Sequence, residues 1–233
     1  MRNSDPAKLS DTLHQRLNAY ALAASAVSAG LFSLGQAAQA EIVYKHANKQ
    51  ITPNHAIPLD LNGDHKTDFH IKDSFTCTSF CEYIEGAITV IPGQTRNETV
   101  GFMERGYQYA SALAAGVRIG KKSPFLTGNA IMVTGGYDAG TTSVGWCDGP
   151  WVNATKRYVG LKFKISGKTH YGWARFNTSC AKNGENTGVL TGYAYETIPG
   201  KSIIAGKTKG KGVVEVAEPA SLGRLAQGTA GEH

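Results

Sequence analysis

One loop of the chain carries side chains of the type and spacing that a hard metal ion requires. From Asp60 to Phe69 the sequence reads DLNGDHKTDF, with oxygen donors at loop positions 1, 3, 5, 7 and 9. The donors are the side chains of Asp60, Asn62, Asp64 and Asp68 and the backbone carbonyl of Lys66. Calcium accepts about six to eight such oxygens at irregular angles. The loop therefore predicts a Ca²⁺ site, and the alternative interpretation is a polar turn between two strands.

The loop resembles the calcium loops of FG-GAP-type repeats more closely than it resembles an EF-hand. An EF-hand has a bidentate acid at loop position 12, where this chain has Ile71, and a glycine at position 6, where it has His65. Histidine tolerates a left-handed backbone better than most residues do, so His65 is compatible with a tight loop. We expect the ion to be structural rather than catalytic.

Four cysteines are the second group of residues that could do chemistry: Cys77, Cys81, Cys147 and Cys180. An even number in a chain made for export, as inferred below, predicts two disulfides. Three pairings are possible, and we favour Cys77–Cys81 with Cys147–Cys180 because the first two are close in sequence. The alternative is a zinc site, but Cys147 and Cys180 lack the close companions of a Cys-x-x-Cys repeat.

No catalytic motif stands out. His170, Glu196 and Asp148 could supply acid–base groups and Cys147 a nucleophile. The chain has no Gly-x-Ser-x-Gly elbow and no His-Glu-x-x-His sequence. We therefore expect no catalytic residues and a non-enzymatic protein, with a hydrolase acting on extracellular polysaccharide as the alternative.

Aromatic side chains are concentrated late in the chain and are the candidates for ligand binding. Aromatic faces on a β-domain can stack on sugar rings. The candidate stacking residues are Trp146, Trp151, Tyr171 and Trp173. The alternative interpretation is that these side chains belong to the core or to cross-strand pairs. The partner expected from the first interpretation is extracellular polysaccharide.

The charge balance excludes one large class of partners. The formal net charge is +6, a mild excess that favours an acidic polysaccharide or another anionic surface. Nucleic-acid binding would require basic residues clustered on one element. The basic cluster of this chain, Lys201, Lys207, Lys209 and Lys211, lies in a glycine-rich segment. We expect no nucleic-acid partner.

The first forty residues have the organisation of an export signal. A basic leader with Arg2, Lys8 and Arg16 precedes an alanine-rich apolar stretch, and Ala38-Gln39-Ala40 has the small-x-small pattern of a signal-peptidase site. We predict a signal peptide over 1–40, cleaved before Glu41. The apolar stretch is too short for a comfortable membrane span of about 20 residues, so we expect a secreted or cell-envelope protein without a stable span.

The sequence predicts that these residues lie on or between short β-strands. The chain has 28 glycines and few charged residues, which fits strands joined by tight turns. The odd-numbered residues of 159–165 are apolar, whereas the even-numbered residues of 158–164 are predicted to face solvent. A turn at 166–168 then predicts a β-hairpin over 157–176. Further strands are expected at 41–44, 56–61, 68–71, 83–91, 131–134 and 189–197. Residues 107–115 could instead form a helical turn.

These strands predict an all-β fold, an antiparallel two-sheet β-sandwich of jelly-roll type. The predicted organisation is a signal peptide at 1–40, the sandwich at 41–206 and a flexible tail at 207–233.

Two segments resemble parts of known proteins. The block RYVGLKF (157–163), HYGWAR (170–175) and GYAYE (192–196) resembles uncharacterised exported bacterial proteins, many with PEP-CTERM-type tails. Residues 216–223, VAEPASLG, resemble the start of such a sorting tail, but Arg224 and Gln227 interrupt the apolar run that should follow. The resemblance implies export and a β-sandwich and no particular activity. We therefore expect a cell-envelope or extracellular-matrix protein whose candidate role is carbohydrate binding.

Overall fold

The computed structural model describes residues 41–77, 82–138 and 144–210. The predicted signal peptide, Cys81 and most of the predicted tail lie outside these residues. The described chain is all β and contains no helix, so the all-β prediction is confirmed. The strands are β1 (Ile42–Ile51), β2 (Ala56–Leu59), β3 (Phe69–Cys77), β4 (Tyr83–Pro92), β5 (Glu98–Glu104), β6 (Tyr107–Ala110), β7 (Arg118–Ile119), β8 (Phe125–Thr127), β9 (Ala130–Asp138), β10 (Val144–Asp148), β11 (Arg157–Ile165), β12 (Lys168–Ser179), β13 (Thr187–Glu196) and β14 (Ile203–Ile204).

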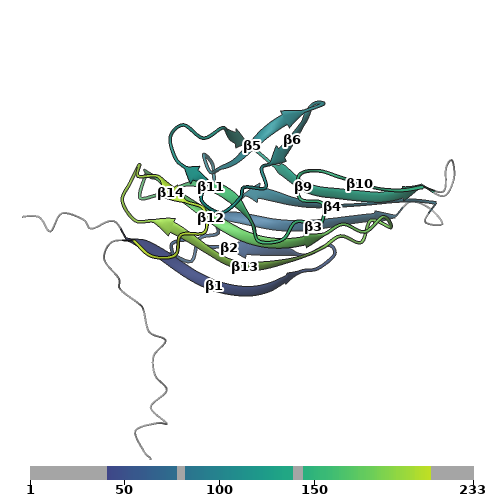
Figure 1. Cartoon of the computed structure of the whole chain (residues 1–233), viewed down its shortest axis with the longest axis horizontal. Helices are drawn as coiled ribbons and strands as arrows, with labels where there is room; N and C mark the ends of the chain where they lie inside the picture. The colour runs from purple at the N-terminus through teal and green to yellow at the C-terminus, as the bar shows by residue number, and fades with distance from the viewer. Residues whose placement is uncertain (1–40, 78–81, 139–143, 211–233) are drawn as a thin grey trace, which may run out of the picture. The chain divides into compact units, whose positions relative to one another are not determined.

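Most of the strands belong to one sheet that bends back on itself (Figure 1). Its order is β1-β13-β12-β11-β5-β6-β9-β4-β3-β2, with β10 paired to β9 and β8 paired to β5. The two strands at the ends of this order, β1 and β2, contact each other. The sheet is therefore nearly closed, and its strands do not divide clearly into the two separate sheets that were predicted.

Strand β5 is the corner that joins the two halves of this sheet. Its first residues pair with β11, where Thr99 faces Leu161. Its last residues pair with β6, where Phe102 faces Tyr109. At the switch between the two partners, a Cβ on Gly101 would collide with the Tyr109 carbonyl oxygen, so the close approach requires glycine. We call β1, β8, β11, β12 and β13 the β11–β13 half, and β2, β3, β4, β6, β9 and β10 the β2–β4 half.

The predicted hairpin over 157–176 is present as β11 and β12. All nine residues of β11 have partners on β12, from Arg157 opposite Phe176 to Ile165 opposite Lys168. The turn residues Ser166 and Gly167 have φ angles of 48° and 79°. Positive φ at both positions is typical of the type I′ turn, whose twist matches that of the flanking strands.

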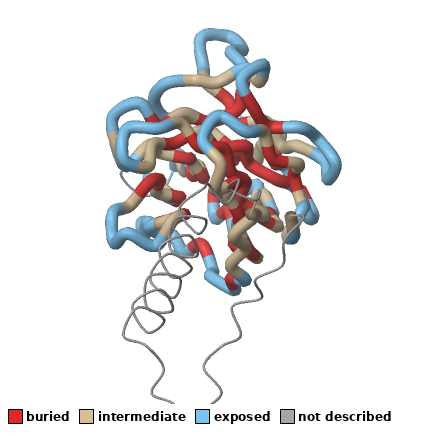
Figure 2. The backbone as a smooth tube through the Cα atoms, turned by 90° about the vertical axis from the view of Figure 1, so that its left-hand side faces the viewer, coloured by how far each residue is buried: buried red, intermediate tan, exposed pale blue. Residues whose placement is uncertain are grey.

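Two hydrophobic cores hold the domain together, and buried residues lie toward the middle of the domain while exposed residues lie at its periphery (Figure 2). The main core lies between the two halves and includes Phe69, Ile88 and Met132 from one half and Phe163 and Phe176 from the other. This shared core explains why the alternating pattern of 159–165 points inward: its apolar face meets apolar side chains of the opposite half.

The second core covers the outer face of the β11–β13 half. The small two-stranded sheet β7–β14 contributes Ile119 and Ile203, which pack with Tyr158, Tyr171 and Trp173. The prediction that Tyr158 faces solvent is therefore wrong, because Tyr158 is buried under this cover. Alternation identifies the residues that share a face of a strand, but it does not reveal a second layer placed over that face.

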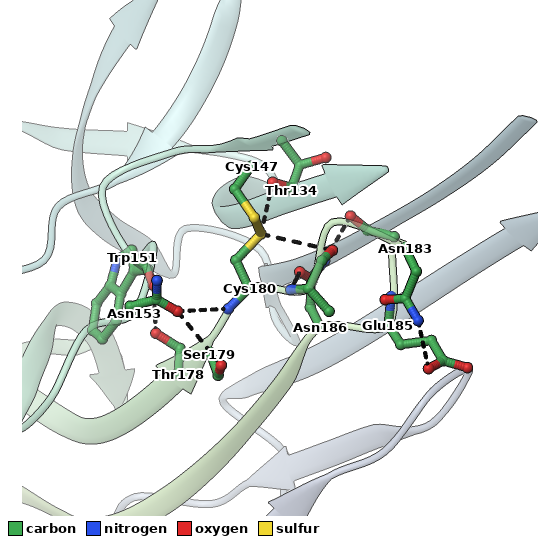
Figure 3. The surroundings of a disulfide bond; sticks show 12 residues. Thr134, Cys147, Trp151, Asn153, Thr178, Ser179, Cys180, Asn183, Glu185 and Asn186 are labelled. Carbon is green, nitrogen blue, oxygen red and sulfur yellow. Dashed lines mark hydrogen bonds between the residues drawn. A yellow bond between two sulfur atoms is a disulfide. The ribbon is translucent and has the colours of Figure 1, made fainter. Parts of the chain in front are cut away.

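The disulfide Cys147–Cys180 links the two halves (Figure 3). It joins β10 to the residue after β12, so this predicted pairing is confirmed. Nearby, the backbone N–H of Cys180 donates to Asn153 Oδ1 at 3.2 Å, and buried Asn186 donates from Nδ2 to the Gly86 carbonyl at 2.8 Å. The other predicted pair, Cys77–Cys81, involves a residue outside the described chain.

Within the described residues, no helix is long and apolar enough to span a membrane.

Candidate functional site

Three of the four predicted stacking residues are buried, which corrects the prediction for them. Trp151 and Trp173 have no exposed surface and Tyr171 is 5% exposed. Trp151 lies in the main core, packs edge-on against Phe176, and donates from Nε1 to the Ala110 carbonyl at 2.8 Å. These rings stabilise the fold and are not available to a ligand.

Trp173 and Tyr171 lie instead in the second core. Trp173 meets Tyr158 edge to face with 5.2 Å between ring centroids, and Tyr171 stacks on Phe125 at 5.8 Å. Both rings lie on the outer face of the β11–β13 half, the face that alternation alone assigns to solvent. In the structure, the β7–β14 sheet and the segment before it cover this face.

The fourth predicted residue, Trp146, lies on a different surface and is half-buried. It sits on β10 opposite Gly136 of β9, which in turn faces Glu85 of β4. A Cβ on Gly136 would come within 2.7 Å of the Trp146 ring, so the ring lies directly over this glycine. Trp146 therefore belongs to the outer face of the β2–β4 half.

The exposed aromatic residues of the structure extend this outer face onto the β5–β6 hairpin, which projects from the rest of the strands (Figure 1). Phe102 is 40% exposed and Tyr107 is 59% exposed. Phe102 faces Tyr109 across the hairpin and Glu104 faces Tyr107, so all four side chains share one side. The Phe102 and Tyr109 rings stack with 5.7 Å between centroids.

One hydrogen bond connects the hairpin to β10, and a second orders a tyrosine on β4. Tyr109 donates from Oη to Asp148 Oδ2 of β10 at 3.2 Å, and on β4 Tyr83 donates from Oη to Glu85 Oε2 at 3.3 Å. Burial raises the pKa of Tyr109, and the Asp148 carboxylate raises it further; burial and then Glu85 have the same effect on the pKa of Tyr83. Tyr83 and Glu85 are two residues apart on β4 and therefore point to the same side of the sheet.

We call this surface the aromatic face and define it by five rings: Tyr83, Phe102, Tyr107, Tyr109 and Trp146. It also carries the carboxylates of Glu85, Glu104 and Asp148. Sequence reasoning missed Phe102 and Tyr107 because β5 showed no clear alternation. The turn at Arg105-Gly106, where both residues have positive φ, was the signal that could have identified the hairpin.

The acid–base residues considered from sequence are not assembled into one site. His170 Nδ1 hydrogen-bonds to the Glu196 carbonyl oxygen at 2.9 Å, and both residues are buried. The Glu196 carboxylate accepts from the Ile198 N–H at 3.2 Å and pairs with Lys201 Nζ at 3.3 Å. Asp148 lies on the aromatic face of the other half, and Cys147 is consumed in the disulfide.

The predicted calcium loop is a tight loop between β2 and β3, and its carboxylates bind the loop's own backbone. Asp60 accepts from the N–H of Gly63 at 2.7 Å and of His65 at 2.9 Å. Asp64 accepts from the Lys66 N–H at 2.9 Å. His65 has a φ of 65°, so it adopts the left-handed conformation that position 6 requires.

Two further atoms of this loop bear on whether its residues suit a cation. Asn62 Oδ1 is buried and has no hydrogen-bond partner. Asp68 is buried and accepts from the Leu61 N–H at 2.9 Å, and its pKa is raised to about 6 by burial and by the carboxylates of Asp60 and Asp64. An all-oxygen donor set with an unsatisfied buried oxygen suits a hard cation. In the described chain, no group of three or more His, Cys, Asp or Glu side chains is arranged to hold a metal.

Comparison with protein-family models, with curated proteins and with solved structures finds no match to this chain.

Proposed function

We propose that the protein is an exported, non-enzymatic binding protein of the cell envelope or extracellular matrix, and that its aromatic face binds polysaccharide. The observation that carries the proposal is the exposure of Phe102 and Tyr107 on a projecting hairpin. Large exposed apolar side chains that are contiguous with further rings mark interaction sites on soluble domains. Aromatic rings stack on the apolar faces of sugars, and nearby polar groups fix the orientation of the ligand.

The neighbouring carboxylates fit this role. Asp148 and Glu85 already accept hydrogen bonds from tyrosine hydroxyls, and each carboxylate oxygen can accept more than one hydrogen bond. Sugar hydroxyls are donors that could occupy the remaining positions. A surface that combines flat rings with fixed acceptors recognises a carbohydrate better than it recognises a purely apolar partner.

Export is part of the same proposal and rests on the sequence of residues 1–40. In support, the first strand begins at Ile42, immediately after the predicted cleavage point. A disulfide also suits an oxidising compartment. We further propose that the bent sheet acts as a sandwich-like scaffold, because its two halves share the main core as two packed layers.

We propose a structural calcium ion in the loop from Asp60 to Asp68, with Asn62, Asp64 and the Lys66 carbonyl as the other ligands. The loop's oxygen donors and the unsatisfied Asn62 Oδ1 support this assignment. An ion there would fix the connection between β2 and β3. The ion would supply rigidity, not chemistry.

The alternative function, a hydrolase acting on extracellular polysaccharide, has one observation in its favour. Glu104 and Asp148 lie on the aromatic face with its rings, and most glycosidases use two carboxyl groups as their catalytic residues. Release of reducing sugar from a bound polysaccharide, abolished by Glu104→Gln or Asp148→Asn, would replace the binding function with this one. Retention of the polymer without release supports the non-enzymatic protein.

A further inference from the structure

A second surface of the domain has the properties of an anion site. A pocket of about 420 Å³ lies between the turn after β7 and the segment before β14. Three of the residues that line it, Arg118, Lys121 and Lys122, are cationic. The remaining lining residues are small: Gly120, Ser123, Gly200 and Ser202. We call it the cationic pocket.

The walls of the pocket are held in place by the fold. Ile119 and Ile203, neighbours of the lining residues, pair across the β7–β14 sheet and are buried in the second core. Arg118 donates from Nη1 to Ser202 Oγ at 2.7 Å, which joins one wall to the other. The two walls also approach closely, since a Cβ on Gly120 would come within 2.7 Å of the Ser202 Cβ.

The turn itself is ordered by two hydrogen bonds. The Ser123 N–H donates to the Gly120 carbonyl at 2.9 Å, and the Gly120 N–H donates to Ser123 Oγ at 3.1 Å. These bonds fix the backbone from which Lys121 and Lys122 project, and both lysines are exposed. The fold therefore presents the two ammonium groups from a defined turn beside an anchored guanidinium.

Within residues 41–77, 82–138 and 144–210, no carboxylate forms an ion pair with the cationic residues of the pocket. Among the described residues, the ion pairs are Lys162–Glu98 and Lys201–Glu196, and no carboxylate lines the pocket. Glu196 precedes one wall in sequence, but it is buried and engaged with Lys201. A concave surface with charge of one sign concentrates counter-ions of the other sign. The pocket should attract an anion.

The volume of the pocket suits a ligand larger than a lone inorganic ion. Small-molecule sites typically have volumes of ~300–1,000 Å³, and this pocket falls within that range. A free inorganic oxyanion displaces only a few waters, each with a share of ~30 Å³. Space therefore remains beside the charge, and arginine is suited to grip a carboxylate, sulfate or phosphate with two parallel hydrogen bonds.

We propose that the cationic pocket binds the oxyanion of an acidic sugar, the carboxylate of a uronic acid or the sulfate of a sulfated residue. This inference rests on the proposed polysaccharide-binding function and names the ligand class as acidic polysaccharide. The aromatic face carries the carboxylates of Glu85, Glu104 and Asp148, which repel acidic groups. We therefore assign the acidic groups of the polymer to the cationic pocket and its uncharged sugar faces to the rings.

The test is calorimetric titration of the full chain with oligouronate, with a sulfated oligosaccharide, with neutral dextran oligomers, and with inorganic sulfate and phosphate. The variant Lys121→Gln/Lys122→Gln removes two charges from the pocket. The matched control Lys49→Gln/Lys182→Gln removes two charges from exposed lysines on other elements. A third variant, Arg118→Lys, keeps the charge but loses the planar fork. Thermal melts verify that each variant is folded.

The expected result is at least a tenfold loss of affinity for an acidic oligosaccharide in Lys121→Gln/Lys122→Gln and a smaller loss in Arg118→Lys. The control should bind as the wild type does, and added salt should weaken binding. Equal losses in the pocket variant and the control would overturn the inference, as would binding of inorganic ions alone. If neutral and acidic oligosaccharides bind Lys121→Gln/Lys122→Gln as tightly as they bind the wild type, the inference is also overturned. The proposed function would then still stand. Failure of every oligosaccharide to bind would overturn both.

Discussion

The hydroxyl of Tyr109 donates a hydrogen bond to Asp148 Oδ2 over 3.2 Å, and this bond joins β6 to β10 on the outer face of the domain. Tyr109 also stacks beneath the exposed ring of Phe102. One buried phenol thus holds an exposed ring on one side and a fixed acceptor on the other. This arrangement gives the aromatic face a defined geometry, although its outermost rings lie in solvent.

The Cys147–Cys180 disulfide should contribute a substantial part of the stability of the domain. It joins residues 33 positions apart, and crosslinks that close loops of this size typically stabilise a protein by about 2–4 kcal/mol. We expect Cys147→Ser/Cys180→Ser to lower the free energy of unfolding by that amount in a urea titration. An unchanged midpoint in urea would show that the crosslink adds nothing to the packing between the halves.

Trp173 should be a stability residue and Tyr107 a binding residue. Because Trp173 is fully buried in the second core, Trp173→Ala should cost about 3–5 kcal/mol in urea unfolding. Trp173→Phe should cost less, since the lost Nε1 has no hydrogen-bond partner. Tyr107→Ala, at an exposed site, should change stability by less than ~0.5 kcal/mol. Comparable losses for Trp173→Ala and Tyr107→Ala would contradict the assignment of the cores.

Asp73 should make the domain less stable as the pH rises. It is 1% exposed, neither carboxylate oxygen has a hydrogen-bond partner, and burial raises its pKa from 3.8 to about 6. The folded state therefore holds this proton more tightly than the unfolded state, and stability falls as the pH rises from about 4 through 6. Raising the pKa from 3.8 to about 6 corresponds to about 3 kcal/mol of stability that is lost when Asp73 ionises.

The substitution Asp73→Asn should remove that part of the pH dependence. Urea unfolding at pH 4 and pH 8 should show a smaller loss of stability in Asp73→Asn than in the wild type. Asp68, whose pKa is also raised to about 6, contributes to both proteins and cancels in the comparison. Glu104→Gln, at an exposed carboxyl, serves as the charge control. Parallel pH profiles for the wild type and Asp73→Asn would refute the prediction.

The proposed calcium site predicts a melt that responds to the ion. At a calcium concentration of 100 times Kd the stabilisation is about 2.7 kcal/mol, which for a domain of this size raises Tm by about 5–10 °C. A chelator should reverse the rise, and Asp64→Ala should abolish it. Lys66→Ala is the matched control, because only the backbone carbonyl of Lys66 is a proposed ligand. A melt that is indifferent to calcium in the wild type would eliminate the site.

Much of the strand layout could be predicted from sequence, because alternation and turn residues are local signals. The hairpin expected over 157–176 is present as β11 and β12, and Ser166-Gly167 supplied a turn signal that does not depend on the rest of the chain. The Cys147–Cys180 pairing was favoured among three possibilities because Cys77 and Cys81 are close in sequence. These features depend on residues that are neighbours in sequence or on a small number of alternatives.

The nearly closed sheet and the true aromatic surface could not be predicted in the same way. The closure depends on β5 changing partners at Gly101, which is a contact between distant segments. The burial of Trp173 depends on β7 and β14, two short strands separated by more than eighty residues. A pattern within one strand shows which residues share a face, and only the packing of other segments decides whether that face meets solvent, core or ligand.

Binding of polysaccharide by the aromatic face can be measured by affinity electrophoresis through gels that contain defined polysaccharides. The samples are the full chain, Phe102→Ala/Tyr107→Ala, and a control, Val117→Ala/Val152→Ala, which removes exposed apolar groups elsewhere. We expect at least one polysaccharide to retard the wild type and the control equally. The aromatic variant should lose at least tenfold in affinity while its melting temperature is unchanged. Equal retardation of all three proteins, or no retardation by any polysaccharide, would contradict the claim.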